Sequence, residues 1–299
     1  MMEDNKLKIL FIINPIAGRN KSTDIAKLIK AKMSDSNKEY KIEYTRAPRH
    51  AIALTKKGLK ENYGTIVAVG GDGTINEVAE GILNIGYGNL GLLPMGTGND
   101  LAKSLGLVMD PAKALDVIIK GELHTIDAGK VDGRIFLNVG SIGFDAEIAK
   151  NTENIKTLFK GKIAYILGLL VTLFKYRNKK VCIELDGEIL EEEILLVAIG
   201  NGKYYGGGMK ICPSAELNDG YFDVCIIDKI SKLKLLFIFP SVFKGNHLKH
   251  TKYVKNYKAN EVKIKSKDRM YINIDGEVFH FNEKDIFSMH DNKIDVICG

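Results

Sequence analysis

The chain carries the stretch GGDGTINE at residues 70–77, and this stretch decides the fold class. A continuous apolar run precedes it at residues 65–69, and apolar residues at helical spacing follow it up to residue 83. A buried strand that turns through glycines into a helix is typical of a parallel sheet. Glycines leave backbone amides open to an anion, and the helix N-terminus adds its dipole. The stretch predicts a phosphate-binding loop, with a glycine-rich turn and an Asp cap as the alternative.

The same alternation of strand and helix extends over the first 120 residues. Continuous apolar runs predict strands at residues 8–13, 65–69 and 90–93, and residues 40–44 are also predicted to form a strand. Apolar residues at helical spacing predict helices at residues 22–33, 51–59 and 75–83, then up to residue 105, and from Pro111 to near Lys120. Because the links are short, we expect a parallel sheet with helices on both faces.

Two further glycine-bearing loops follow predicted strands. They are NPIAGR at residues 14–19 and MGTGND at residues 95–100. Loops at the carboxyl ends of parallel strands converge on one edge of the sheet, where α/β proteins bind ligands. Neither the P-loop pattern with Gly-Lys-Ser/Thr nor GxGxxG occurs, which argues against a P-loop NTPase and an ordinary Rossmann dehydrogenase.

The pattern changes after Gly121. Asp132-Gly133 and Asp186-Gly187 are hairpin turns between predicted strands. Those strands cover residues 123–131, 135–139, 181–185 and 189–199, and others are predicted at residues 221–227, 261–265, 271–274 and 294–297. Many strands joined by such turns predict an antiparallel sandwich or barrel. We therefore expect two domains, residues 1–123 and 124–289.

Basic charge is confined to two segments. The formal net charge is +6, yet residues 150–180 carry +7 and residues 229–269 carry +10. Each segment holds an apolar helix candidate flanked by lysines, residues 162–176 and 232–243, favoured as core helices over membrane inserts. The lysines form either a solvated face or one that binds an anionic membrane, where each contributes about 1 kcal/mol. No helix-turn-helix, zinc-finger or RNA-recognition pattern supports nucleic-acid binding.

The composition excludes several classes of protein. Hydrophobic residues make up 45% and charged residues 27%, which is a globular composition. The longest apolar stretch, residues 163–174, has twelve residues, whereas a membrane-spanning helix needs about 20. The four cysteines form no Cys-x-x-Cys pair, which argues against a zinc site or a disulfide framework. With no signal peptide at the N-terminus, we expect a soluble cytoplasmic protein.

The motifs together resemble the diacylglycerol kinase catalytic-domain family, and are closest to its soluble bacterial lipid kinases. The resemblance rests on NPIAG, GGDGTINEV and PMGTGNDLAKSLG in this order and spacing. Further family motifs are NVGSIGFDA at 138–146, NGKYYGGGM at 201–209, LNDGYFDV at 217–224 and DGE at 275–277. The GGDGT loop alone is shared with NAD kinases and phosphofructokinases.

The resemblance implies a fold and an ATP site. The fold is a nucleotide-binding α/β domain followed by a β-sandwich, with the chain end near residues 290–299 returning to the first domain. The residues implied to bind ATP are Asn14, Pro15, Ile16, Ala17, Gly18, Arg19, Thr45, Gly70, Gly71, Asp72, Gly73, Thr74, Ile75, Asn76, Glu77 and Thr97. For Thr45 and Arg19, a solvated strand end and a solvated cation are the alternatives.

The resemblance also implies catalytic and metal-binding carboxylates. Glu277 matches the proposed general base, and Asp72, supported by Asp100, matches a carboxylate that organises water and Mg²⁺. Sequence does not decide whether Glu277 or Asp72 takes the proton. The metal ligands implied for Mg²⁺ are Glu216, Asp219 and Tyr221. Ordinary turns at residues 217–221 and 275–277 are the alternatives.

The implied function is an ATP-dependent, Mg²⁺-requiring lipid kinase that acts at the inner face of the cell membrane. Diacylglycerol is the favoured acceptor, and a sphingoid base, ceramide, phosphatidylglycerol or an undecaprenol-like lipid are alternatives. NAD kinase is a weaker rival. A nucleotide-dependent membrane regulator without turnover is the non-enzymatic alternative. The oligomeric state stays open, although an exposed sandwich edge could pair two copies as a homodimer.

Overall fold

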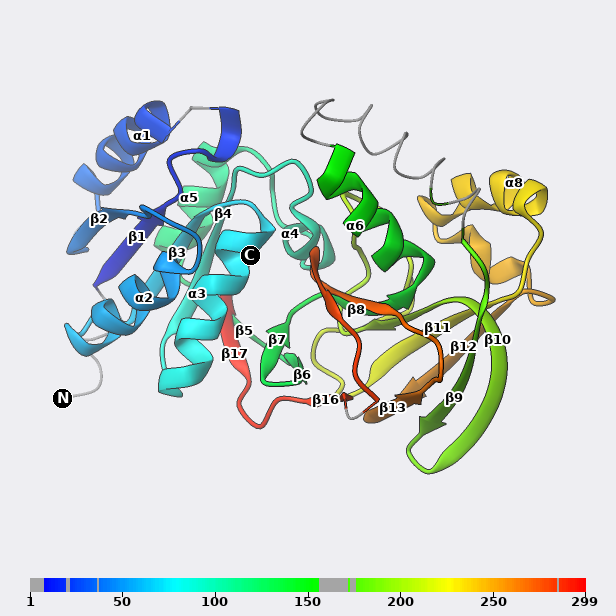
Figure 1. The fold of residues 1–299 in the computed structure, drawn as a ribbon. Coiled ribbons are helices and arrows are strands. Elements are labelled where there is room, and N and C mark those ends of the chain that lie inside the picture. The colour runs from blue at the N-terminus through cyan, green and yellow to red at the C-terminus, as the bar shows by residue number, and fades with distance from the viewer. Residues whose placement is uncertain (1–7, 20–21, 37, 156–171, 173–175, 284) are drawn as a thin grey trace. The chain divides into compact units, whose positions relative to one another are not determined.

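The computed structural model describes residues 8–19, 22–36, 38–155, 172, 176–283 and 285–299. They form two compact units (Figure 1). The first unit contains the described residues up to Ala128 together with His290–Gly299, and the second spans Gly129–Met289. The chain passes between the units twice, after Ala128 and after Met289.

The first unit is built on a six-stranded sheet that is parallel except at one edge. Its strands, in spatial order, are β2 (Tyr40–Tyr44), β1 (Ile9–Ile13), β3 (Thr65–Gly70), β4 (Asn89–Pro94), β17 (Ile294–Ile297) and β5 (Leu123–Ile126). Only β5 is antiparallel to its neighbour, β17. Strands β1 and β3 are buried along their whole length, as their continuous apolar runs predict.

Helices cover both faces of this sheet. They are α1 (Ser22–Ser34), α2 (His50–Lys60), α3 (Asp72–Ile85), α4 (Asp100–Ser104) and α5 (Pro111–Lys120), with a short 3₁₀ helix, η2 (Ala17–Arg19), after β1. Ile9, Phe11 and Ile13 share one hydrophobic cluster with side chains of α1 and α5. Leu10 points to the opposite face and contacts Gly58 of α2. The predicted α/β class is confirmed.

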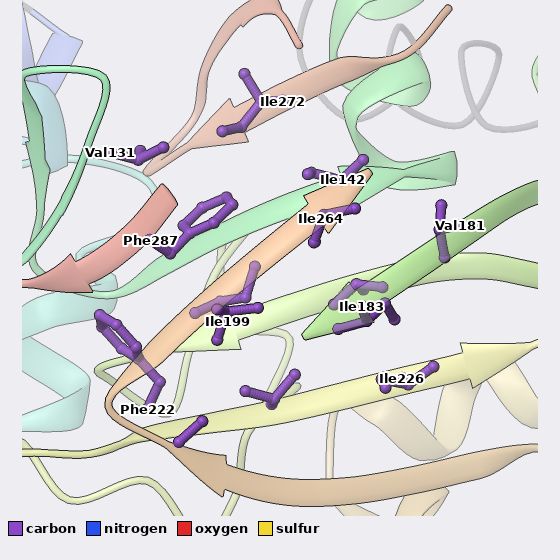
Figure 2. Packing of buried hydrophobic residues seen from close by; sticks show 14 of the residues in the cluster. Val131, Ile142, Val181, Ile183, Ile199, Phe222, Ile226, Ile264, Ile272 and Phe287 are labelled. Atoms are coloured by element: carbon purple, nitrogen blue, oxygen red, sulfur yellow. The ribbon is translucent and has the colours of Figure 1, made fainter. Parts of the chain in front are cut away.

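The second unit is an antiparallel sheet of eleven strands. Nine follow the spatial order β15 (Glu277–His280), β14 (Tyr271–Ile274), β8 (Val139–Gly143), β10 (Glu188–Gly200), β9 (Lys179–Leu185), β13 (Glu261–Lys265), β16 (Ile286–Met289), β6 (Gly129–Val131) and β7 (Arg134–Phe136). β10 also pairs with β11 (Phe222–Asp228), and β11 pairs with β12 (Val254–Ala259). The sheet curls around one core, into which Ile142, Phe222 and Phe287 point (Figure 2). The predicted antiparallel architecture is confirmed.

Helices flank the second unit's sheet. They are α6 (Phe144–Ile155), α8 (Lys232–Val242) and the 3₁₀ helix η3 (Asn246–Lys249). The helix predicted at residues 232–243 is therefore present. The one predicted at residues 162–176, with its apolar stretch, lies outside the described residues apart from Thr172 and Tyr176. Among the described residues, no helix is long and apolar enough to cross a bilayer.

One predicted strand is divided between the two units. The segment 123–131 forms β5 in the first sheet and β6 in the second. Between them Asp127 is buried and pairs with Lys293 at 2.8 Å, while the amide of His290 donates to the carbonyl of Ala128. These contacts hold the chain in place where it passes from one sheet to the other. They are polar contacts, so the periodicity of apolar residues does not predict them.

Candidate active site

The second and third glycine loops pack backbone against backbone. A Cβ atom on Gly96 would lie 2.6 Å from the Cα atom of Gly71 and 2.8 Å from Oδ1 of Asn99. The backbone of Gly71 cannot move aside to make room for this Cβ atom as the end of a flexible side chain could. Glycine is therefore required at this crossing, which follows the carboxyl ends of β3 and β4.

Asp72 ties these two loops together. Its carboxylate accepts hydrogen bonds from the amides of Asn99 at 2.8 Å and Asp100 at 2.6 Å. Those amides begin α4, so Asp72 caps a helix that is distant in sequence. Asn99 has a left-handed backbone, with φ 52°, and its side chain bonds both the amide and the carbonyl of Gly96. The third loop is thus fixed from two sides.

The first loop is tied to both of the others. Nδ2 of Asn14 donates to Oγ1 of Thr74 at 3.1 Å, and Oδ1 of Asn14 accepts from the amide of Ile16 at 3.2 Å. Gly18 is left-handed, with φ 65°, and a Cβ there would lie 2.9 Å from Cε of Met95. The structure thus brings together the three loops that the sequence predicts to converge.

A hollow opens between the three loops. Its lining residues are Asn14, Ile16, Ala17, Gly18, Gly71, Gly73, Thr74, Met95, Gly96 and Thr97. Helix α3 begins at this hollow, after Gly71, without a side-chain cap. A Cβ on Gly73, in its first turn, would meet no atom within 4 Å. The exposed helix N-terminus and this open space suit the oxygens of an anion.

A second hollow adjoins the first across Asn14, Ile16, Gly73 and Thr74. It adds Pro15, Thr45, Arg46, Ala47, Pro48 and Glu77 to the lining. Sequence reasoning did not single out Arg46, although this exposed cation directly follows Thr45 at the end of β2. The two arginines of the TRAPRH stretch, residues 45–50, are the sequence feature that could have indicated a cation at this site.

Several predicted site residues lie elsewhere. Neither hollow is lined by Gly70, Asp72, Ile75, Asn76 or Asp100. Ile75 and Asp100 are buried, and Thr74 fills the space beside Gly70. The carboxylate of Glu77 accepts from the amides of Arg49 and Ala51, which begin α2. The structure does not describe the side chain of Arg19. The motif residues thus include a lining set and a supporting set, and Glu77 belongs to both.

In the second unit, Asp275 holds the strands around the DGE segment. Its carboxylate accepts from the amides of Leu137 at 2.7 Å, Val139 at 2.8 Å and Asn138 at 3.2 Å. Asp275 and Gly276 both have positive φ, 46° and 98°, as a tight two-residue hairpin requires. Residues 275–276 therefore do form the hairpin turn, but the Asp275 carboxylate is bonded to backbone amides and is not a solvated acid. Glu277 follows it, exposed, as the first residue of β15.

A second family motif meets the same strands. The amides of Asn201 and Gly202 both donate to the carbonyl of Asn138 at 2.8 Å. Nδ2 of Asn201 donates to the carbonyl of Leu137, also at 2.8 Å. The motifs at residues 138–146, 201–209 and 275–277 thus interlock, and they fix the hairpin that presents Glu277.

The predicted metal ligands lie in an acidic turn before β11. Asp219 accepts from the amide of Tyr221 at 3.0 Å and pairs with Nζ of Lys258 at 2.6 Å. Burial raises the pKa of the neighbouring Asp223, and the charges of Asp219 and Glu216 raise it further. Oδ2 of Asp223 has no hydrogen-bond partner within the described part of the chain. In that same part, no three His, Cys, Asp or Glu side chains are arranged to hold a metal.

An apolar pocket of about 40 Å³ lies between the second unit's sheet and its helices, within a packed hydrophobic cluster. Its lining includes Phe144 and Ile148 of α6 and the inner face of α8. Two buried polar groups reach it, Asp145 and His247. Burial raises the pKa of Asp145, whose Oδ2 accepts from Ser141, and burial lowers the pKa of His247. Sequence reasoning did not anticipate this pocket, because its walls come from segments about 110 residues apart.

Comparisons with known proteins agree with both units. Residues 8–131 match the diacylglycerol kinase catalytic domain, and residues 138–283 match the YegS C-terminal NAD kinase beta sandwich-like domain. The chain is 35% identical to a diacylglycerol kinase of Staphylococcus carnosus over 267 residues, which cover 89% of this chain and 87% of the relative. It is 32% identical to one of Bacillus subtilis over 268 residues, covering 89% and 88%.

Solved structures show the same fold. A diacylglycerol kinase structure from Bacillus anthracis matches with a TM-score of 0.77 at 22% identity, over 98% of this chain and 97% of that one. A putative diacylglycerol kinase from the same organism matches with a TM-score of 0.79 at 24% identity and the same coverage. The fold and the sequence relatives define a lipid kinase. The chain belongs to the diacylglycerol kinase family.

Two glycine substitutions in these loops should differ sharply in stability. Gly96→Ala places a methyl group against the backbone of Gly71, and we expect it to lower the free energy of unfolding by about 1–3 kcal/mol. Gly73→Ala adds a methyl group in open space within a helix, and should be neutral or stabilising by up to about 1 kcal/mol. Thermal unfolding of both variants is the measurement. Equal stability would contradict the close packing of the loops.

Proposed function

We propose that this protein transfers the γ-phosphoryl group of ATP to the hydroxyl group of diacylglycerol, giving phosphatidic acid. The observation that carries the proposal is the hollow at the N-terminus of α3, where Gly71 and Gly73 leave backbone amides accessible. Kinases of this family use ATP, and such a hollow suits its phosphate oxygens. The relatives named diacylglycerol kinase support the choice of acceptor.

ATP can be divided between the two adjoining hollows. We assign the phosphates to the hollow of Gly71, Gly73 and Thr97, and the nucleoside to the hollow of Thr45. Asn14 and Thr74 belong to both and are hydrogen-bonded to each other, so they lie where the two parts of the nucleotide would join. Arg46 supplies a positive charge at the rim.

The relatives, rather than the interior of the second unit, favour a lipid over NAD as the acceptor. The apolar pocket has a volume of about 40 Å³, which leaves room for no more than a few water molecules. Its lining is the packed cluster that includes Phe144, Leu195 and Val254, so we do not assign the acyl chains to it.

We assign the proton transfer to Glu277. Phosphoryl transfer needs the acceptor hydroxyl to lose its proton as the new P–O bond forms. Both carboxylate oxygens of Asp72 already accept backbone hydrogen bonds, whereas Glu277 is exposed on a hairpin that Asp275 holds in place. In this proposal Asp72 and Asp100 position the loops, and the Glu277 carboxylate accepts the proton.

The acidic turn before β11 fits Mg²⁺ by its donor chemistry. Mg²⁺ prefers oxygen ligands and keeps several waters, so one or two carboxylates suffice. We propose that Asp219 holds it, with Glu216 and Tyr221 contributing and the unpaired oxygen of Asp223 beside them. Bound there, Mg²⁺ would neutralise the clustered carboxylates, a role that Lys258 fills for Asp219 in this structure.

The substrate also implies a location. Diacylglycerol resides in membranes, so we propose that the protein works in the cytoplasm in peripheral contact with the inner face of the cell membrane. The excess of lysine in residues 229–269 supports contact with anionic lipid.

Incubation with γ-labelled ATP and separate acceptors tests the function. We expect label in phosphatidic acid when diacylglycerol is supplied, and little with sphingoid base, ceramide, phosphatidylglycerol or NAD. Glu277→Gln should lower kcat by about 10²–10⁴-fold, because it removes the proton acceptor and keeps the shape. Wild-type turnover in that variant would remove Glu277 from the mechanism, and label in NAD alone would overturn the lipid assignment.

The phosphate assignment predicts a specific effect of Gly73→Ala. The added methyl group projects into the open hollow, so the KM for ATP should rise by roughly tenfold or more, corresponding to a loss of about 1.4 kcal/mol. The KM for diacylglycerol should stay the same. Gly106→Ala, also in the first unit and with open space around its Cβ position, is the matched control, read alongside a thermal melt because its φ is 70°.

The metal assignment is testable without turnover. Mg²⁺ should raise the Tm of the wild-type protein, because an ion that binds only the folded chain stabilises it. Asp219→Asn should abolish that rise. Asp186→Asn, an acid in the same unit that bonds the amides of Asn260 and Glu261, should leave it intact. A rise that survives Asp219→Asn would place the ion elsewhere.

A further inference from the structure

Helix α8 is apolar on two opposite sides. Its inner side chains, Leu235, Ile238, Phe239 and Val242, line the apolar pocket. Its outer side chains are also large and apolar, yet they are exposed: Leu233 by 73%, Leu236 by 47% and Phe237 by 84%. Phe243, the C-cap residue directly after the helix, is exposed by 50%. We call Leu233, Leu236, Phe237 and Phe243 the α8 ridge.

The α8 ridge is a continuous stripe rather than scattered residues. Positions 233, 236, 237 and 240 follow the three- and four-residue spacing of one helix face, and position 240 is an exposed proline. A surface helix normally has a polar outer face, and a helix that is apolar all round is usually covered on every side. The ridge is therefore a surface that works in contact with an apolar partner.

The charge next to the ridge selects the partner. From Lys229 to Lys258 the chain has eight lysines and no acidic residue. Lys244 directly follows the ridge, and Lys249 and Lys252 lie in and after η3, which contacts α8. None of these three makes an ion pair with a residue that the structure describes. Apolar side chains bordered by lysines without carboxylate partners among the described residues match an anionic lipid surface better than a second copy of this basic chain.

We propose that the α8 ridge inserts into the headgroup layer of an anionic membrane, with the neighbouring lysines on the lipid phosphates. The helix has 11 residues, about 16 Å, so it can lie in the interface and cannot cross a bilayer. The proposal rests on the proposed action on a membrane lipid and names the docking surface for it.

The absence of tryptophan permits a direct test, because one introduced indole reports on one position. Phe237→Trp should show blue-shifted emission, and quenching by brominated lipid, on vesicles of phosphatidylglycerol and phosphatidylcholine. Ile189→Trp is the matched control: Ile189 is 64% exposed, in the same unit but on the β9–β10 hairpin. It should stay unquenched. Equal quenching at both positions, or none at position 237, would overturn the proposal.

Removal of the ridge gives a second measurement. The double variant Leu233→Ser, Phe237→Ser should bind those vesicles at least tenfold more weakly in co-sedimentation. The reason is that burying each of the two apolar side chains in the membrane is expected to raise the affinity at least tenfold. Ile189→Ser should bind as the wild type does. Neither ridge residue lines the apolar pocket, so the double variant should keep its Tm and its turnover of short-chain diacylglycerol presented without a bilayer.

The outcomes separate this proposal from its rivals and from the function itself. Unchanged vesicle binding in the double variant overturns the ridge proposal. A change in sedimentation of the free protein, with vesicle binding intact, would instead make the ridge a contact between copies. If the wild type phosphorylates no diacylglycerol while the indole still inserts, the proposed function fails and the docking surface stands.

Discussion

The contact between the backbones of Gly71 and Gly96 is the constraint on which the first unit's site depends. It places the ends of β3 and β4 closer together than any residue with a Cβ would permit. With that spacing fixed, the Asp72 carboxylate can reach the first amides of α4, and Gly18 can lie against Met95. The hollow lies where α3 begins, and residues of all three loops line it. The glycines thus create the site by close packing as much as by exposing amides.

Acidic residues in the family motifs mostly hold backbone. Asp72 binds the start of α4, Glu77 binds the start of α2, and Asp275 binds three successive amides around Asn138. A carboxylate that accepts several backbone amides makes strong charge-assisted bonds and leaves little capacity for a substrate proton. This division of roles is the physical basis for separating Glu277, which is exposed, from the other carboxylates.

Much of the fold could be predicted because hydrophobic periodicity is local. The strands at residues 40–44 and 261–265 were predicted to the residue, and the Asp-Gly hairpins follow from backbone chemistry. Helix α3 begins at Asp72, earlier than its apolar spacing indicates, and its N-cap residue is Gly71, which gives no side-chain capping signal. Strand β12, with the sequence VKNYKA, lies in a basic stretch and has no apolar alternation, so the sequence does not predict it. The roles of Asp72 and Glu77 could not be inferred, since their partners lie about 27 residues away in the chain.

The second unit shows why composition alone could not separate a core helix from a membrane-contacting one. The sequence favoured a core role for residues 232–243 because they are apolar, and the inner face of α8 does face the apolar pocket. Yet the same run also supplies Leu233 and Phe237 to the surface. A helix in the core of a soluble protein loses nothing by exchanging such outward residues for charges, which would improve solubility. Apolar residues such as Leu233 and Phe237 on the outer face, with lysines rather than acids beside them, give a physical advantage only if that face is removed from water. Contact of its outer face with a membrane surface therefore explains the two apolar sides of α8 better than packing within the protein alone.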